Sequence, residues 1–130
     1  MALSEYTRGQ LIGHLLRTST YSKPAAVYVA LFKGDGNEMS GGGYARVQHG
    51  PGDAYWRDQT AGNGQSTNIG AITFPTPETT NWGVATAVRL FDASTGGNEI
   101  GAGVLSSPKT INVGDPAPTF PDGALLVSVT

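Results

Sequence analysis

Apolar and polar residues alternate along much of this chain, and alternation with a period of two is typical of β-strands. The clearest candidate is Ala26–Phe32, in which Val27, Val29 and Leu31 fall on one face and two aromatic residues fall on the other. Because both faces are apolar, we expect this strand to be buried in the middle of a sheet.

Several further segments have the composition of short strands. They are Tyr44–Gln48, Ala54–Arg57, Asn68–Phe74, Val84–Phe91, Glu99–Leu105, Thr110–Val113 and Ala124–Val129. Pro75 and Pro77 close one of them, since proline cannot donate a hydrogen bond within a sheet. About eight short strands separated by turn residues predict an all-β fold, either a β-sandwich or a jelly-roll-like body.

One N-terminal segment, Ser4–Thr18, has the helical period instead. Ser4 can serve as the N-cap, and Glu5 in the first turn suits the helix dipole. The apolar stripe of this helix consists of Leu11, Ile12, Leu15 and Leu16. Gly9 and Gly13 each weaken the helix by about 1 kcal/mol, so the stripe has to pack on something. We expect it to cover one end of the chain's own β-core, with docking on a neighbouring subunit as the alternative.

A length of 130 residues predicts a single domain. We expect the N-terminal helix and a linker over residues 1–22 and the β-body over residues 23–130. Two loops in the body are long and polar, Lys33–Gly43 and Gln59–Thr67. Long loops in a compact domain tend to be functional or disordered.

Charged residues make up only 14% of the chain, against roughly 25% in an average soluble domain. Sparse charge suits a subunit that packs into an assembly, although an ordinary polar β-domain can have the same composition. The formal net charge is −2 and the Lys and Arg residues are scattered, so we expect no direct binding of nucleic acid. The chain has no cysteine, no signal-peptide pattern and no apolar stretch near the ~20 residues that span a bilayer.

Few residues suggest catalysis or metal binding. His14 lies beside the apolar stripe of the predicted helix, where a boundary role is favoured over that of a catalytic base. His49 follows a predicted strand, and a metal site of both histidines would need these distant positions to meet together with a carboxylate, so it is not favoured. Asp35–Glu38 supplies oxygen ligands of the kind that bind calcium, but the full ligand spacing is missing, so an ordinary turn is favoured. Asp53 and Asp58 do not obviously face each other across the aromatic segment that they flank. We therefore expect no catalytic residue, no metal and no cofactor.

The segment Tyr55–Arg57 combines three residue types that are enriched at interface hot spots. We predict that it contacts a partner, and that Trp56→Ala weakens assembly while leaving the fold intact. The loop Lys33–Gly43 is the second predicted contact. The interface hypothesis names Tyr55, Trp56, Arg57, Lys33, Asp35, Asn37 and Met39. A carbohydrate-binding module that uses Tyr55 and Trp56 is a less favoured alternative.

The segment Ser40–Val47 carries no obvious chemistry, because its three glycines simply allow the backbone to turn into a short strand. It resembles a segment of a family of small tailed-bacteriophage virion proteins, labelled tail fibre, minor tail or head decoration proteins. The resemblance continues, in the same order, through Ile72–Pro75, Asn81–Asp92, Phe91–Asn98, Pro108–Asp115 and Asp122–Ala124. Two features depart from the family. Arg89 stands where a smaller or apolar residue is expected, and Gly50–Ser66 has no clear counterpart.

This resemblance implies a non-enzymatic structural protein of the virion, made in the cytoplasm of a bacterial host. We favour a capsid decoration, or cement, protein that stabilises the shell as a homo-oligomer. A trimer would suit the three-fold positions of an icosahedral shell. The alternative is a structural subunit at the base of a tail fibre or at the tail tip. The expected partners are other copies of the chain and either the major capsid protein or tail proteins, with no nucleic acid and no membrane.

Overall fold

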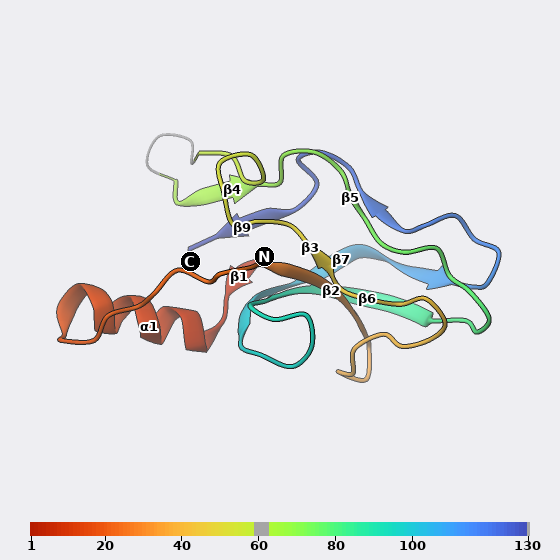
Figure 1. Ribbon diagram of the computed structural model, residues 1–130, viewed down its shortest axis with the longest axis horizontal. Coiled ribbons are helices and arrows are strands. Elements are labelled where there is room, and N and C mark those ends of the chain that lie inside the picture. Colours follow the sequence, from red (N-terminus) through yellow and green to blue (C-terminus); the bar gives the residue numbers. More distant parts are fainter. Residues whose placement is uncertain (59–62, 130) are drawn as a thin grey trace.

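The computed structural model of the protein describes residues 1–58 and 63–129. The described residues form an all-β fold with one short helix, so the predicted fold class is confirmed (Figure 1). The elements, in chain order, are β1 (Ala2–Leu3), α1 (Glu5–Leu16), β2 (Tyr28–Lys33), β3 (Val47–Gln48), β4 (Gln65–Thr67), β5 (Ile72–Thr73), β6 (Gly83–Phe91), β7 (Glu99–Ile111), β8 (Thr119–Phe120) and β9 (Leu126–Ser128).

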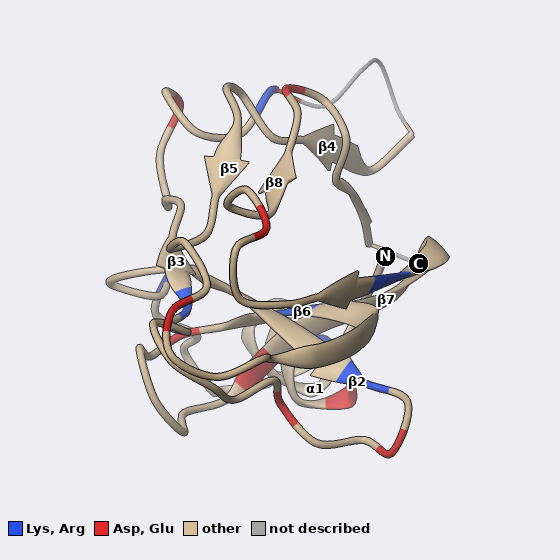
Figure 2. Ribbon diagram, turned by 90° about the vertical axis from the view of Figure 1, so that its right-hand side faces the viewer, with Lys and Arg blue, Asp and Glu red and all other residues tan. Residues whose placement is uncertain are grey.

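Seven of the described strands form one curled sheet in the order β3-β2-β6-β7-β1-β9-β4. Its neighbours are antiparallel except β1 and β9, which pair in parallel, so the sheet is mixed. The remaining strands, β5 and β8, form a small antiparallel sheet. Figure 2 shows β5 and β8 lying across β6 and β7, so the fold has two β-layers.

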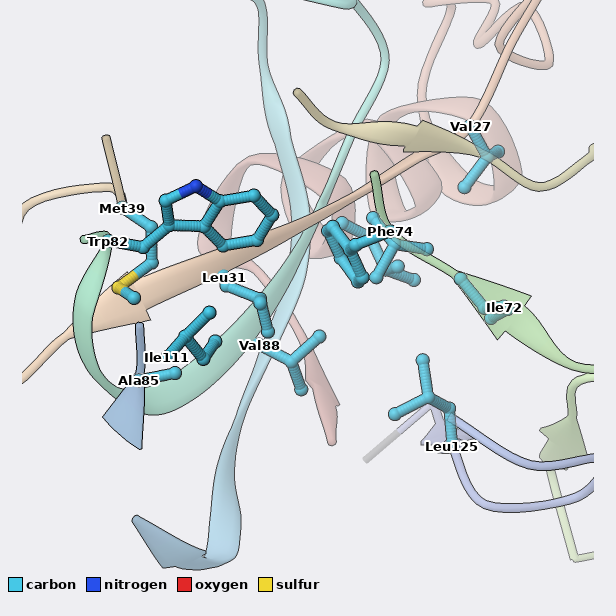
Figure 3. Packing of buried hydrophobic residues seen from close by; sticks show 12 residues of the cluster. Val27, Leu31, Met39, Ile72, Phe74, Trp82, Ala85, Val88, Ile111 and Leu125 are labelled. Carbon is cyan, nitrogen blue, oxygen red and sulfur yellow. The ribbon is translucent and has the colours of Figure 1, made fainter. Parts of the chain in front are cut away.

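The main core fills the space between these layers (Figure 3). Val29 and Leu31 of β2 and Val88 of β6 contribute from the large sheet, while Ile72 contributes from the small sheet. The alternation that predicted a strand near Ala26–Phe32 therefore points its aliphatic residues into the core, as expected.

A second, smaller cluster covers the opposite face of β2 and β6. Phe32 and Phe91 stack there with their ring centroids 5.8 Å apart. The guanidinium of Arg89 lies 4.1 Å from the Phe32 ring centroid, and that of Arg46 lies 3.9 Å from the Phe91 centroid. Arg89 thus has a packing role that explains how a charged residue is accommodated in β6, and the burial of β2 on both faces is confirmed.

The strand boundaries differ from the predicted ones where hydrogen-bonded pairing with another strand, and not the local residue pattern, sets where a strand begins and ends. The two segments predicted near Glu99 and Val113 form one long strand, β7, which continues through Pro108 beside an irregular pairing with β6. The segment predicted at Ala54–Arg57 makes only an isolated bridge, from Trp56 to Asn68. Strands β1 and β8 have two residues each, too few to show any alternation. Residues 59–62 of the predicted loop Gln59–Thr67 lie outside the described residues, and its last three residues form β4.

The helix is present where it was predicted, and Ser4 is its N-cap, accepting a hydrogen bond from the Thr7 amide at 3.1 Å. Its expected docking on the β-core is wrong. The outer part of the predicted stripe is exposed, because the helix is attached near its N-terminal end and its other end extends away from the sheets (Figure 1). Its N-terminal turn is anchored to β7, because the Ser4 amide and the Thr7 hydroxyl both donate to the Ile100 carbonyl, at 2.8 and 3.0 Å.

Candidate functional site

The glycine segment Ser40–Gly43 fits tightly against residues 76–82. The indole of Trp82 donates a hydrogen bond of 2.7 Å to the Gly42 carbonyl, and the Glu78 amide donates to the same carbonyl at 2.9 Å. A Cβ atom on Gly42 would overlap the carbonyl oxygen of Glu78. Glycine is required at Gly42 because another stretch of backbone occupies the place of a side chain.

Arg46 connects this segment to a distant turn. Its side chain is only 6% exposed, and it donates two hydrogen bonds of 2.9 Å to the two carboxylate oxygens of Glu38. Its remaining terminal nitrogen donates to the carbonyls of Ala93 and Gly96 at 2.8 and 2.9 Å. A bidentate guanidinium–carboxylate pair fixes orientation as well as distance, so Arg46 holds the 38–46 segment against the turn after β6.

Tyr44 completes the network on the core side. Its hydroxyl donates to Glu38 at 2.8 Å and accepts from the Leu31 amide at 3.1 Å, and its ring packs edge-on against Trp82. Burial raises the pKa of Tyr44 well above its ordinary value of 10.0. Burial also opposes ionisation of Glu38, but the hydrogen bonds from Arg46 and Tyr44 outweigh it and hold the pKa of Glu38 below 4.5. All these polar groups are satisfied within the protein, so the network serves folding.

The predicted contact loop is a tight hairpin that follows β2. The Lys33 amide donates to the Asn37 carbonyl at 2.8 Å, and the Asn37 amide donates to the Asp35 carboxylate at 2.9 Å. The latter bond lowers the pKa of Asp35. Asp35 and Asn37 are exposed at the tip, whereas Met39 is buried in the main core. The structure thus separates the four predicted contact residues of this loop into three at or near the surface and one in the core.

The segment Tyr55–Arg57 is divided in a similar way. Trp56 is partly buried against the main core, and its indole donates to the His49 carbonyl at 2.9 Å. The imidazole of His49 is buried edge-on between the rings of Tyr55 and Trp56. Tyr55 remains 44% exposed. Of the two aromatic residues, Tyr55 is therefore the one that is free to meet a partner.

Arg57 pairs with Asp122. One of its terminal nitrogens donates to both carboxylate oxygens, at 2.8 and 2.7 Å. These bonds, and a further one from the Gly70 amide, lower the pKa of Asp122. Arg57 also donates to the carbonyl of Asn68, whose own side chain is fully buried, so it holds the 122–125 turn against β4.

Neither histidine lies in a catalytic arrangement within the described residues. His14 accepts a hydrogen bond from the Tyr21 amide at 3.2 Å, and His49 is enclosed by aromatic rings. Across residues 1–58 and 63–129, no three His, Cys, Asp or Glu side chains are grouped so that they could hold a metal ion. No helix in that part of the chain is long and apolar enough to cross a membrane.

Two further surfaces expose apolar residues: the end of the predicted helical stripe, and a hollow that the sequence pattern did not predict. The first, the helix tip, consists of Ile12, Leu15 and Leu16, which are 53%, 71% and 77% exposed. The second, the β7 groove, is a hollow of about 640 Å³ between the C-terminal half of β7, β8 and the segment that leads into β9. The predicted stripe gave a signal for the helix tip, whereas the β7 groove forms from segments distant in sequence and has no local signal.

Comparison with known proteins decides the family. Residues 2–128 match the family described as Podophage GP4 fiber I protein gp80. The chain belongs to this family. No curated protein matches the chain.

The family match confirms the resemblance to phage virion structural proteins that was drawn from the segments between Ser40 and Ala124. Membership of a phage fibre family makes this chain a virion-associated structural protein. The arrangement of Glu38, Tyr44 and Arg46 agrees with that assignment, because the charged residues with the most extensive contacts are used to position backbone segments.

Proposed function

We propose that this protein is a non-enzymatic structural subunit of a phage tail fibre. The observation that carries the proposal is the family match over residues 2–128, because the description of that family is that of a phage fibre protein. Capsid decoration, the location favoured from the sequence resemblance, has less support because nothing in the family description refers to a capsid. The rigid network around Arg46 and the sparse charge, seen in Figure 2, are compatible with a packed fibre subunit.

The contacts to neighbouring virion proteins are proposed to involve Tyr55 and the hairpin tip at Lys33, Asp35 and Asn37. Tyr55 offers an exposed ring next to a rigid aromatic cluster, and a preorganised aromatic side chain loses little entropy on binding. The hairpin tip offers one amine and one carboxylate, 3.9 Å apart. Met39, Trp56 and Arg57 support these surfaces through their contacts within the protein.

Carbohydrate binding by Tyr55 and Trp56 has less support. A stacking platform needs the face of an aromatic ring, and Trp56 packs against the core with its N–H bonded to His49. Self-association is part of the proposal, since the helix tip exposes three large aliphatic side chains. A trimer remains the proposed state of the homo-oligomer.

Immunogold electron microscopy of intact virions tests the location. An antibody raised against this chain should label the tail fibres, and pre-immune serum should label nothing. Label over the shell would contradict the fibre assignment and support capsid decoration. Label on neither structure would contradict a virion role altogether.

A further inference from the structure

The helix tip is largely exposed in the isolated molecule. Helix α1 has 12 residues, two of them glycine, and helices of this length are marginal in water unless they pack on something. Its N-terminal turn is fixed to β7 by the bond from Thr7 to the Ile100 carbonyl, at 3.0 Å. The exposed end points away from the sheets (Figure 1), so the chain's own core does not cover Ile12, Leu15 and Leu16.

The β7 groove exists because β1 is much shorter than β7. Strand β1 pairs with β7 only at Gly101 and Ala102, and beyond Gly103 this edge of β7 has no paired strand among the described residues. Core residues such as Leu31 and Val88 form the floor of the opening. The rim carries Val104, which is 86% exposed, together with Phe120 and Leu126. Its volume of about 640 Å³ falls within the roughly 300–1,000 Å³ of pockets that hold drug-sized molecules.

We propose that the helix tip of one copy of this protein docks in the β7 groove of a second copy. One surface is the projecting apolar end of a helix, and the other is a hollow with an apolar floor in the same chain. They cannot meet within one copy, because α1 is anchored at the start of β7 and extends away from the C-terminal half of β7, which forms the groove (Figure 1).

Charge at the two surfaces fits the same arrangement. The tip is the C-terminal end of α1, where the helix dipole favours a cation. Lys109 lies on the groove rim and makes no ion pair among the described residues. Arg17 follows the helix tip, and Asp115 lies in the turn that leads to Pro118 of the rim. Asp115 accepts a bond from the Asn112 amide but has no cationic partner in the described part of the chain.

A contact between two different surfaces has a structural consequence. Each added copy leaves one free helix tip and one free β7 groove, so the assembly either closes into a ring or continues as a filament. A ring that closes after three copies would be the trimer expected from the sequence. An open series would suit a fibre.

Cysteine cross-linking tests this contact directly, since the natural chain has no cysteine. Leu16→Cys and Val104→Cys are placed in separate full-length chains, mixed, and treated with a mild copper oxidant. The mixture should give a disulfide-linked heterodimer. A double variant carrying both changes should give a trimer or a ladder of larger products. A mixture of Leu16→Cys with Thr95→Cys, an exposed turn position outside the groove, measures cross-linking by random collision.

Two results would overturn the proposal. Dimers of Leu16→Cys alone, at the yield expected for the mixture, would show that helix tips pack on each other. A Leu16→Cys and Val104→Cys mixture that cross-links no better than the Thr95→Cys control would show that the tip does not enter the groove.

A second measurement uses no cysteine. Leu15→Ser with Leu16→Ser should weaken self-association in sedimentation by roughly tenfold or more, since truncating buried interface anchors has effects of this size. Arg8→Ser, on an exposed position nearer the anchored end, should leave association unchanged. Gly9→Ala in the Leu15/Leu16 background keeps the helix formed, because Gly9 has no atom within 4 Å of an added Cβ. Unchanged association of that triple variant would contradict the proposal.

This inference rests on the proposed self-association, but virion labelling and cysteine cross-linking can each give a negative result independently of the other. Virion labelling can place the protein on the shell while the cross-link forms, and in that case only the fibre assignment is lost. Labelling on the fibre without the cross-link would discard only the helix-tip contact.

Discussion

The carboxylate of Glu38 receives both hydrogen bonds of the Arg46 guanidinium fork, each at 2.9 Å, on a side chain of Arg46 that is almost fully buried. On one side of the pair, Tyr44 donates to Glu38 and packs against the main core. On the other side, the Arg46 guanidinium lies over the Phe91 ring, which belongs to the opposite face of the sheet. A segment that looked like a simple glycine-rich turn in the sequence is therefore the connection between the two faces of β2 and β6.

Glu38→Gln should destabilise the fold. Glutamine keeps the shape but removes the negative charge, which leaves the buried guanidinium of Arg46 without a counter-charge. Breaking a buried pair costs roughly 3–5 kcal/mol; because the Glu38 side chain is 26% exposed and partly screened, we expect a loss of about 2–3 kcal/mol. Urea unfolding measures it. Asp35→Asn, in the exposed hairpin, is the matched control and should have a much smaller effect. Equal losses for the two variants would contradict the role given to Glu38.

The pH dependence of stability should report the same pair. The pKa of Glu38 is lower in the folded state than its ordinary value of 4.5, so the unfolded chain binds more protons in this range. The contribution of Glu38 is fully present above pH 4.5 and is lost as the pH falls through the folded-state pKa. The difference in unfolding free energy between the natural protein and Glu38→Gln should shrink toward zero over that interval. A difference that stays constant from neutral to strongly acidic pH would show that charge is not responsible.

Glycine at position 42 should be indispensable, whereas glycine at position 9 should not. A side chain on Gly42 would overlap the Glu78 carbonyl, and neither backbone segment can move without breaking the Trp82 bond. Gly42→Ala should therefore lower the unfolding free energy by ~4 kcal/mol or more, or prevent folding. Gly9 lies in α1 with open space around it, so Gly9→Ala should raise helix stability by about 1 kcal/mol. Thermal unfolding followed by circular dichroism distinguishes the two, and a mild effect at Gly42 would contradict the observed packing.

The parts of the fold that follow from local pattern could be predicted from the sequence. Strands β2 and β6 are runs of six and nine residues rich in apolar and β-branched residues, and α1 has a cap and a helical period. Strands β1 and β8 could not be predicted, because two residues carry no period and their conformation is set by pairing with distant strands.

The candidate contacts could be predicted only in part. Residue type pointed to Tyr55 and Trp56 as candidate contacts, but type does not say which of two adjacent aromatic rings faces the core. Burial at Trp56 depends on its bridge to Asn68, a partner 12 residues away. In the same way, the stripe on α1 was visible, but its exposure depends on where the helix is anchored, and that anchor is the Ile100 carbonyl of β7.

Trp56 and Tyr55 should therefore respond differently to truncation. The sequence alone led us to expect that Trp56→Ala would weaken assembly and leave the fold intact. The structure places the Trp56 ring against the core and its N–H on the His49 carbonyl, at 2.9 Å. Replacing a fully buried tryptophan by alanine costs roughly 3–5 kcal/mol, and for this partly buried ring we expect a loss of about 2–4 kcal/mol in unfolding free energy.

Tyr55→Ala is the matched variant, one residue away. Its ring is 44% exposed and packs edge-on against His49, so its loss should cost about 1 kcal/mol or less. If Tyr55 contacts a neighbouring virion protein, Tyr55→Ala should instead reduce incorporation into virions, measured by quantitative blotting of purified particles. The melting temperature of the soluble variant shows that this reduction is larger than its small loss of stability explains. Trp56→Ala that melts like the natural protein would show that its ring is not part of the core. Normal incorporation of Tyr55→Ala would remove Tyr55 from the proposed contact and leave the hairpin tip at Lys33, Asp35 and Asn37 to be tested in its place.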